Sequence, residues 1–220
     1  SNGVRIMKAY PEFAKLDLTT SERVLAAGGN KALYKFSVKA VGGPVSIYKL
    51  TFNIGSSTVS ATTSVYGLYA FTDAFSSEDT TFSATGLLNG GSCVNAKQST
   101  DSNDSVIGVF MDATGCNQAT TTYKISSGQT RWFKLTATFG SVETGTGSES
   151  VSMSLLGDAS YSVNASTLME TAAGLDATAD STGDANDDFI WSPISTTTQN
   201  TVNDLDFTNG YQVKGLPGTN

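Results

Sequence analysis

Five carboxylate or amide side chains crowd into the stretch DSTGDANDDFIWSP, at positions 180–193. They are four aspartates and one asparagine, with no basic residue among them: Asp180, Asp184, Asn186, Asp187 and Asp188. Calcium takes about six to eight oxygen ligands from carboxylates, amides and backbone carbonyls on a flexible loop. Asp184, Asn186 and Asp188 have the D-x-N-x-D spacing that opens many calcium loops, and Asp180 would add a ligand. The stretch is therefore a candidate calcium site.

The same stretch also has other interpretations. Counted from Asp184, position six is Phe189, where an EF-hand needs glycine, and position twelve is Ser195, where it needs glutamate. An EF-hand is excluded, whereas a less regular site closed by Asp176 or by another loop stays open. The second interpretation is a solvated linker, because water and salt screen the repulsion between its carboxylates. The third is the acidic half of an active site.

The chain has two cysteines, Cys93 and Cys116, in the loop-like settings GGSCVN and ATGCNQ. They are either two free thiols or one disulfide, and an export-like composition favours the disulfide. Such a bridge would close a loop of about 24 residues and contribute roughly 3 kcal/mol through chain entropy. A catalytic thiolate is disfavoured, because the chain has no histidine to activate it.

The absence of histidine excludes several classes of catalytic and metal site. Ser-His-Asp triads, Cys-His dyads and histidine-ligated zinc all need an imidazole. The sequence also has no phosphate-binding loop and no dinucleotide fingerprint. Two carboxylates suffice to hydrolyse a glycoside, but the sequence singles out no pair. We therefore predict a protein that is not an enzyme, with glycoside hydrolysis as a less favoured alternative.

Two aromatic side chains make carbohydrate binding the alternative function. Trp132 alternates with Phe133, so it faces outward if Phe133 faces the core, and Tyr66 is opposed to Val65 in the same way. Sugar sites on β-sandwiches use such exposed rings. A large exposed ring usually finds cover, however, so Trp132 is also expected to pack under a loop or the C-terminal segment.

The elements that would position these residues are strands. The 220 residues include 28 serines and 30 threonines, whereas charged residues make up only 15%. Threonine, valine, tyrosine and phenylalanine suit half-buried strand surfaces. Alternation with a period of two, or a short apolar run, predicts about eight strands. They lie at 4–10, 32–40, 46–54, 64–73, 106–111, 121–125, 131–139 and 150–158.

The alternation also predicts which side chains of these strands share a face. They are Tyr34, Phe36, Val38 and Ala40; Tyr48, Leu50, Phe52 and Ile54; Val65, Tyr69 and Phe71; Phe133, Leu135, Ala137 and Phe139; and Val151, Met153 and Leu155. Helix is scarce, with a single turn expected at 10–16 and a helix at 167–174. Many short strands without alternating helices predict an all-β, antiparallel β-sandwich, immunoglobulin-like or related.

Two segments echo one another. GNKALYKFSVKA from Gly29 and GQTRWFKLTATF from Gly128 align without gaps, and both read as a glycine turn that enters a strand. They are two equivalent strands of one sandwich, the same strand in two tandem domains, or two amphipathic strands that are alike by chance. The absence of a proline-rich linker favours one domain.

The domain prediction has three parts. Residues 1–2 look like a cloning remnant, residues 3–160 form the β-sandwich, and residues 161–220 form an acidic C-terminal segment. That segment contains Asn209-Gly210, a strong short-range signal for a hairpin. We expect the segment to pack on the sandwich or to form a junction with a following domain.

The charge distribution bears on the partners. The net charge is −7, and eleven acidic residues but no Lys or Arg lie between Leu135 and Val213. This disfavours nucleic acid, which needs a basic footprint, and favours cations or basic partners. No apolar run is long enough to predict membrane insertion. The hydroxyl-rich composition favours an extracellular or cell-surface location.

Four segments resemble repetitive secreted surface proteins of bacteria, some of them S-layer-associated: AAGGNKALYKFSVKA, VSIYKLTFNI, SSGQTRWFKLTATF and DDFIWSP…DFTNGYQVKGLPG. Those proteins are built from immunoglobulin-like sandwiches. The resemblance touches most of the chain through strands and turns, and it implies no catalytic residue. It implies a non-catalytic structural or adhesive module, with other surface modules or cell-wall or extracellular polysaccharide as partners. No cofactor is required, and calcium is the one that the acidic stretch would bind.

Overall fold

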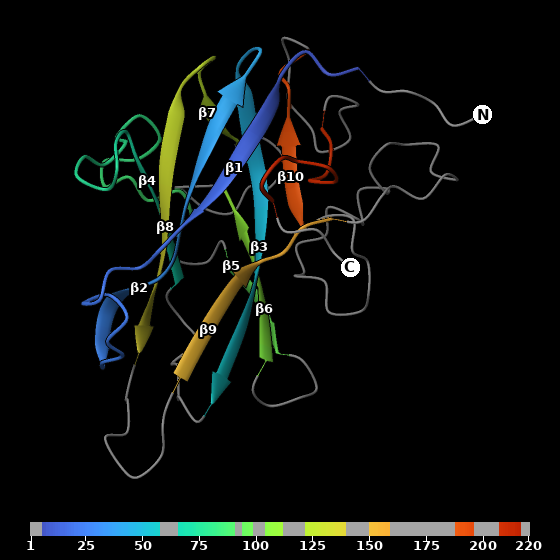
Figure 1. Cartoon of the computed structure of the whole chain (residues 1–220). Helices are drawn as coiled ribbons and strands as arrows, with labels where there is room; N and C mark the ends of the chain where they lie inside the picture. Colours follow the sequence, from blue (N-terminus) through green and yellow to red (C-terminus); the bar gives the residue numbers. More distant parts are fainter. Residues whose placement is uncertain are drawn as a thin grey trace.

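The computed structural model of the chain describes residues 6–57, 66–90, 94–98, 104–111, 122–139, 150–158, 188–195 and 207–216. These residues form ten strands in two antiparallel sheets that pack face to face (Figure 1). The described part contains no helix, and hence none that is long and apolar enough to cross a membrane. The prediction of an all-β, antiparallel β-sandwich is confirmed.

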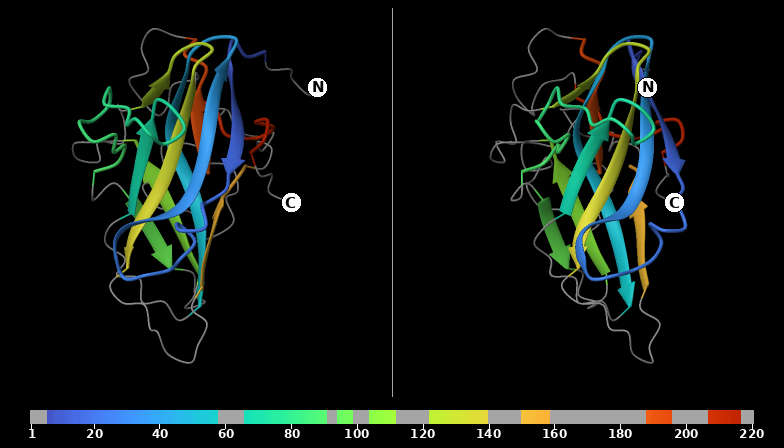
Figure 2. Two further views of the ribbon diagram at one scale, coloured as in Figure 1. Left: turned by 60° about the vertical axis from the view of Figure 1, so that its left-hand side comes forward. Right: turned by 90° about the vertical axis from the view of Figure 1, so that its left-hand side faces the viewer.

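The two sheets, seen from two further sides in Figure 2, have different strand orders. The first sheet has the order β1 (Tyr10–Leu16), β2 (Gly28–Val41), β8 (Thr130–Phe139), β4 (Tyr66–Phe71). The second has the order β10 (Phe189–Ser192), β3 (Val45–Ser57), β6 (Asp104–Phe110), β5 (Val94–Gln98), with β7 (Tyr123–Ile125) and β9 (Ser150–Leu155) also paired to β3. Strand β3 therefore pairs with every other strand of its sheet except β5, which pairs with β6.

The two segments that echo one another in the sequence are neighbours in one sheet. Strands β2 and β8 pair antiparallel, with Phe36 opposite Phe133. The inward faces predicted for both strands are confirmed, because all eight of these side chains are buried: Tyr34, Phe36, Val38, Ala40, Phe133, Leu135, Ala137 and Phe139. The ring of Phe36 stacks on Phe133, with centroids 4.8 Å apart, and lies at the centre of the core.

Strand β3 departs from the predicted alternation at Tyr48. Leu50, Phe52 and Ile54 face the main core as expected, but Ile47 rather than Tyr48 precedes them there. The pairing with β10 shifts register at this point, because a bulge in β3 reverses the phase of its side chains. Tyr48 instead packs with a second apolar cluster that contains Phe110, Ile190 and Phe207.

The predicted face of β4 is wrong by one residue. Tyr66, Leu68 and Ala70 face the core, whereas Phe71 is buried on the other side of the sheet. Alternation fails here because both faces of β4 are covered. The ring of Phe75 packs edge-on against Phe71, 5.5 Å between centroids, so the following loop covers the outer face.

The N-terminal strand was also misassigned from the sequence. Residues 10–16, for which we expected a helical turn, are β1, and residues 6–9 of the expected strand 4–10 are irregular. Proline is compatible with an edge strand when its missing N–H points away from the sheet. Pro11 lies on β1, which is an edge strand of its sheet. The proline is therefore accommodated in a strand here and does not mark the start of a helix.

The hairpin predicted at Asn209-Gly210 does not form. The turn of this segment lies at Tyr211 and Gln212, and Gln212 takes the left-handed conformation with φ of 61°. A side chain at Gly210 would collide with Leu216 and other neighbours, so its glycine serves close packing rather than a turn. The helix predicted at 167–174 lies outside the described residues.

Candidate functional site

One side of the sandwich is built from three strand edges. Strands β10 and β9 follow one another along the same edge of β3, because both lie opposite β6 across that strand. Strand β1 forms the facing edge of the other sheet. The gap between these edges is filled in its upper part, beside β10, by residues 207–216, which we call the C-terminal strap (Figure 1).

The strap is clasped to β1. The Phe13 N–H donates to the Lys214 carbonyl over 2.8 Å, and the Lys214 ammonium lies 2.8 Å from the Glu12 carboxylate. Glu12 and Lys214 pair in the parallel direction. Gly215, with φ of 83°, makes this close approach feasible, because a Cβ there would collide with the Phe13 carbonyl oxygen.

A buried aspartate ties the strap to β9 and β10. The Asp158 carboxylate, which follows β9, accepts the backbone N–H groups of Asp188, Phe189 and Gly210. Trp191 and Thr208 exchange two backbone hydrogen bonds, and the Trp191 indole donates to the Asn209 carbonyl. One carboxylate thus satisfies three backbone donors that would be costly to bury alone.

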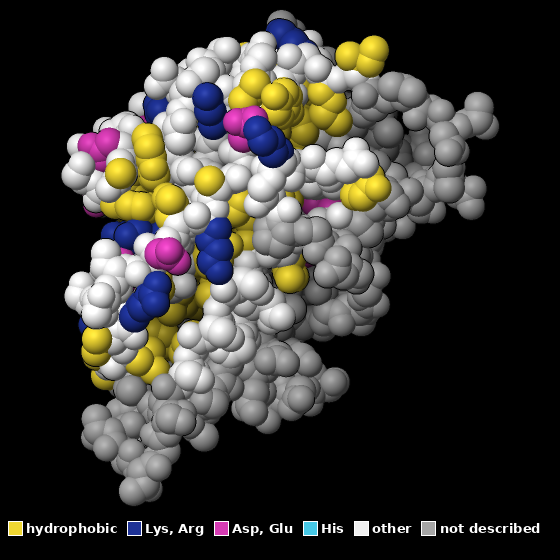
Figure 3. Space-filling view, in the orientation of Figure 1, with side chains coloured by type: hydrophobic (Ala, Val, Ile, Leu, Met, Phe, Trp, Pro, Cys, Tyr) yellow, Lys and Arg dark blue, Asp and Glu magenta, His cyan; other side chains and the backbone are white. Residues whose placement is uncertain are grey.

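Below the strap, the described residues of β1, β2 and β9 line a hollow of about 210 Å³. Its floor is largely aliphatic: Leu16, Leu18, Leu33, Val151 and Met153, with Tyr34 beside them. Its remaining lining is charged: Lys15, Asp17, Arg23 and Lys35. Figure 3 shows apolar side chains lying open between Lys and Arg side chains on this face. We call this hollow the β1–β9 groove.

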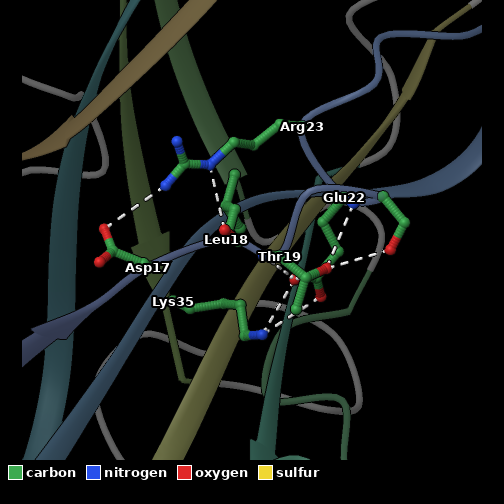
Figure 4. A network of polar contacts seen from close by, with 7 residues as sticks. Asp17, Leu18, Thr19, Glu22, Arg23 and Lys35 are labelled. Atoms are coloured by element: carbon green, nitrogen blue, oxygen red, sulfur yellow. Dashed lines mark hydrogen bonds and ion pairs between the residues drawn. The ribbon is translucent and has the colours of Figure 1, made fainter.

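One of the groove's cations is neutralised in place. The Lys35 ammonium lies 3.0 Å from the Glu22 carboxylate, which also accepts the Thr19 N–H over 2.8 Å (Figure 4). Burial alone would raise the pKa of Glu22, but the hydrogen bonds from Thr19 and Lys35 outweigh it and hold that pKa below its usual value. Lys35 is therefore a fixed structural charge at the end of the groove.

Arg23 and Lys15, the other two cations of the groove, have N–H donors that are available to a ligand. Arg23 reaches Asp17 only at 3.7 Å, with 63% and 93% of the two side chains exposed, so this ion pair is weak. The Lys15 ammonium has no ion pair within the described part of the chain and lies 5.5 Å from the centre of the Tyr34 ring. The groove therefore offers positive charge beside an apolar floor.

The backbone around the groove is also unpaired. Because Phe13 donates away from β2 and directions alternate along a strand, the N–H of Lys15 points away from β2 too. On β9, Leu156 donates to Thr51 of β3, so Met153 and Val151 point to the free edge. These three backbone N–H groups have no partner among the residues that the structure describes.

Tyr34 of β2 reaches across to β9 at the end of the groove. The Leu155 N–H, which also points away from β3, donates to the Tyr34 hydroxyl. Burial raises the pKa of Tyr34, and this hydrogen bond offsets only part of that rise. The tyrosine thus satisfies with its side chain one backbone N–H on the free edge of β9, next to the N–H groups of Met153 and Val151 that point to the same edge.

A second polar cluster lies away from the groove, where the loop after β4 meets β7 and β8. The buried Asp79 carboxylate accepts the Tyr123 hydroxyl and the Arg131 Nε, both over 2.7 Å. Its other oxygen accepts the Thr81 N–H over 3.0 Å. All its partners belong to the protein itself, so this cluster fixes the loop to the sandwich and leaves no open position for a ligand.

The residues predicted for carbohydrate binding do not form a site together. Tyr66, expected to face outward, is buried in the main core with 7% of its surface exposed, because β4 has the opposite phase. Trp132 is half-buried and lies opposite Ser37 of β2 and Phe71 of β4. Only Trp132 therefore retains a partly accessible ring.

Most of the predicted calcium and disulfide residues lie outside the described part of the chain: Cys93, Cys116, Asp180, Asp184 and Asn186. Asp188 is described and is buried, with its N–H donating to Asp158 over 2.6 Å. It therefore directly precedes β10 and is not solvated, so the solvated-linker interpretation does not hold for this residue. No group of acidic residues suited to a metal ion occurs among the described residues.

The groove was not predicted, and only a weak signal for it exists in the sequence. Lys15 follows Phe13 with the spacing of an inward-facing strand residue, which is unusual for a lysine.

The chain matches no known protein family, no curated protein and no solved structure. A function must therefore be argued from the site itself.

Proposed function

We propose that this chain is a non-catalytic structural or adhesive module of a secreted or cell-surface bacterial protein, joined to other surface modules or to extracellular polysaccharide. The observation that best supports the proposal is the clasp between β1 and the C-terminal strap, at Glu12, Phe13 and Lys214. A disulfide between Cys93 and Cys116 and calcium at the acidic stretch 180–188 would reinforce such a module, and both remain predictions.

The direction of the clasp suits a module under tension. Glu12 and Lys214 run parallel, so a pull on the two ends of the sandwich draws β1 and the strap in opposite directions along one line. The backbone hydrogen bond, the ion pair and the packing of Val213 and Leu216 on the core are then loaded together. An antiparallel pair pulled from one end would instead open one bond at a time. Shear of this kind raises the barrier that governs forced unfolding.

Gly215→Ala should weaken the clasp selectively. Its Cβ would collide with the Phe13 carbonyl, so we expect a lower unfolding force in single-molecule pulling and hydrogen exchange at the Phe13 amide faster by about tenfold. Gly128→Ala is the matched control, because Gly128 has a similar φ of 75° but no atom within 4 Å of its Cβ. Equal unfolding forces for the wild type and both variants would contradict a tension-bearing role.

A further inference from the structure

We infer that the β1–β9 groove receives an extended, acidic peptide segment of a partner protein, which adds along the exposed strand edges. This inference deepens the proposed adhesive role by naming the class of partner, and it rests on that role. It is carried by the continuity of the groove with the strap, by the unpaired backbone groups, and by the charge and apolar lining.

The strap already shows that this side of the sandwich takes a segment that pairs with it through backbone hydrogen bonds, here at Thr208 and Lys214. Its residues lie between β1 and β10, donate and accept backbone hydrogen bonds at Phe13 and Trp191, and pack Val213 and Leu216 on the core. The groove continues the same gap downward, between β1 and β9. A second segment placed there would meet the same kind of surface.

The backbone of the groove is suited to strand addition. Val151 and Met153 of β9 direct their N–H and C=O groups to the free edge, and Lys15 does so from β1. Exposed strand edges are templates for extended peptides, which gain affinity from backbone hydrogen bonds and specificity from pockets for alternate side chains. The hollow of about 210 Å³ has room for one or two small apolar side chains against its aliphatic residues.

The charges select the partner. Lys15, Arg23 and Lys35 face the groove against Asp17 and the nearby Glu22, and Lys15 has no carboxylate partner within the described residues. An inward-pointing lysine discourages pairing with an arbitrary strand. An acidic segment would neutralise it and use the donors of Arg23. A polysaccharide would leave the aliphatic floor poorly matched, because sugar hydroxyls need polar partners there.

The test uses synthetic peptides in which Asp and Val alternate, labelled for fluorescence anisotropy, with mapping by amide chemical shifts. We expect saturable binding and shifts at Lys15, Val151 and Met153. Lys15→Met should weaken binding by about tenfold, because it removes the charge and keeps the backbone N–H. The matched control Lys124→Met, at an exposed lysine of β7, should leave it unchanged.

Backbone pairing is tested separately from charge. Met153→Pro removes one edge N–H, and a peptide N-methylated at alternate positions removes the complementary donors without altering the protein. We expect both to weaken binding by about tenfold or more. The methylated peptide gives a clear result even if the proline variant does not fold.

Three outcomes would overturn the inference. They are equal binding of a peptide in which Lys and Val alternate, undiminished binding of the N-methylated peptide, and binding of polygalacturonate in place of the acidic peptide. Failure here is distinguishable from failure of the structural role: a protein that binds no peptide but still shows the force difference between Gly215→Ala and Gly128→Ala keeps that role and loses only this partner.

Discussion

Asp79→Asn is expected to lower the free energy of unfolding by about 3 kcal/mol, because it breaks a buried pair and leaves its donors unmatched. Asp79 is 1% exposed, and its carboxylate lies 2.7 Å from both the Tyr123 hydroxyl and the Arg131 Nε. The amide of the variant keeps the shape but places an N–H₂ group against those donors. Urea denaturation at neutral pH measures the loss. Glu78→Gln, at an exposed acid next to Asp79, is the control and should change stability by less than about 0.5 kcal/mol.

The same aspartate predicts a pH dependence with a definite sign. Burial would raise the pKa of Asp79, but hydrogen bonds from Thr81, Tyr123 and Arg131 outweigh it and lower that pKa to about 2. Because the folded-state pKa lies below the unfolded value near 3.9, the stabilisation is complete above that value and is lost as the pH falls through 2. The shift corresponds to about 2.5 kcal/mol.

The comparison of the wild type with Asp79→Asn isolates this contribution. Hydrogen bonds from Ser76 and Ser77 also lower the pKa of Asp73 to about 2, so the wild-type curve alone would mix both groups. Asp73 is present in both proteins, and its effect cancels in the difference. We expect the stability gap between them to shrink by about 2 kcal/mol from pH 5 to pH 2. A gap that stays constant would show that the Asp79 carboxylate is not engaged as described.

The hydrogen bonds of Asp79 and Asp158 could not be predicted from the sequence, because their partners lie far away along the chain. Asp79 meets Tyr123 and Arg131 only because the loop after β4 folds back on β7 and β8. Asp158 likewise accepts donors that follow it by 30 or more positions. Nothing in a short sequence window distinguishes such an aspartate from a solvated one, since the signal is the fold itself.

Alternation predicted the strand faces well where one face of a sheet is polar. In β2 and β8 the outward positions carry Lys35, Ser37 and Lys134, so the apolar set identifies the core without ambiguity. It failed at Tyr66, because β4 is apolar on both faces and Phe71 is covered by a loop. A one-residue error in phase then sends every side chain of the strand to the opposite face.

The groove escaped prediction for a different reason. Its lining comes from the end of β1, the loop that follows it, β2 and β9, and β9 lies more than a hundred positions further along the chain than the other three. Each residue is ordinary for a strand or a loop, and only the meeting of two free edges gives the set its chemistry. The sequence did contain Lys15 at an inward-facing position, but its significance depends on β1 being an edge strand.

Phe36→Ala is expected to produce the largest loss of stability among these variants, about 4 kcal/mol. The ring is fully buried and stacks on Phe133 and Phe13, with ring centroids 4.8 Å and 5.1 Å apart. Its removal therefore leaves a cavity between the two sheets. Aromatic pairs add roughly 0.5–1.5 kcal/mol to the burial of their area, which places this site toward the upper end of the range for core phenylalanines.

The neighbouring strand positions provide the control for Phe36. Lys39 lies on the same strand but is exposed, so Lys39→Ala should change the free energy of unfolding by less than about 0.5 kcal/mol. Guanidinium denaturation of both variants measures the contrast. A loss below about 0.5 kcal/mol for Phe36→Ala as well would mean that β2 does not turn this face to the core. Phe133 lies opposite Phe36 in the pairing of β2 with β8, so its replacement tests the same face. In the sandwich described here, Phe36→Ala and Phe133→Ala both lower the free energy of unfolding strongly. If β2 turned this face away from the core, both losses would be small.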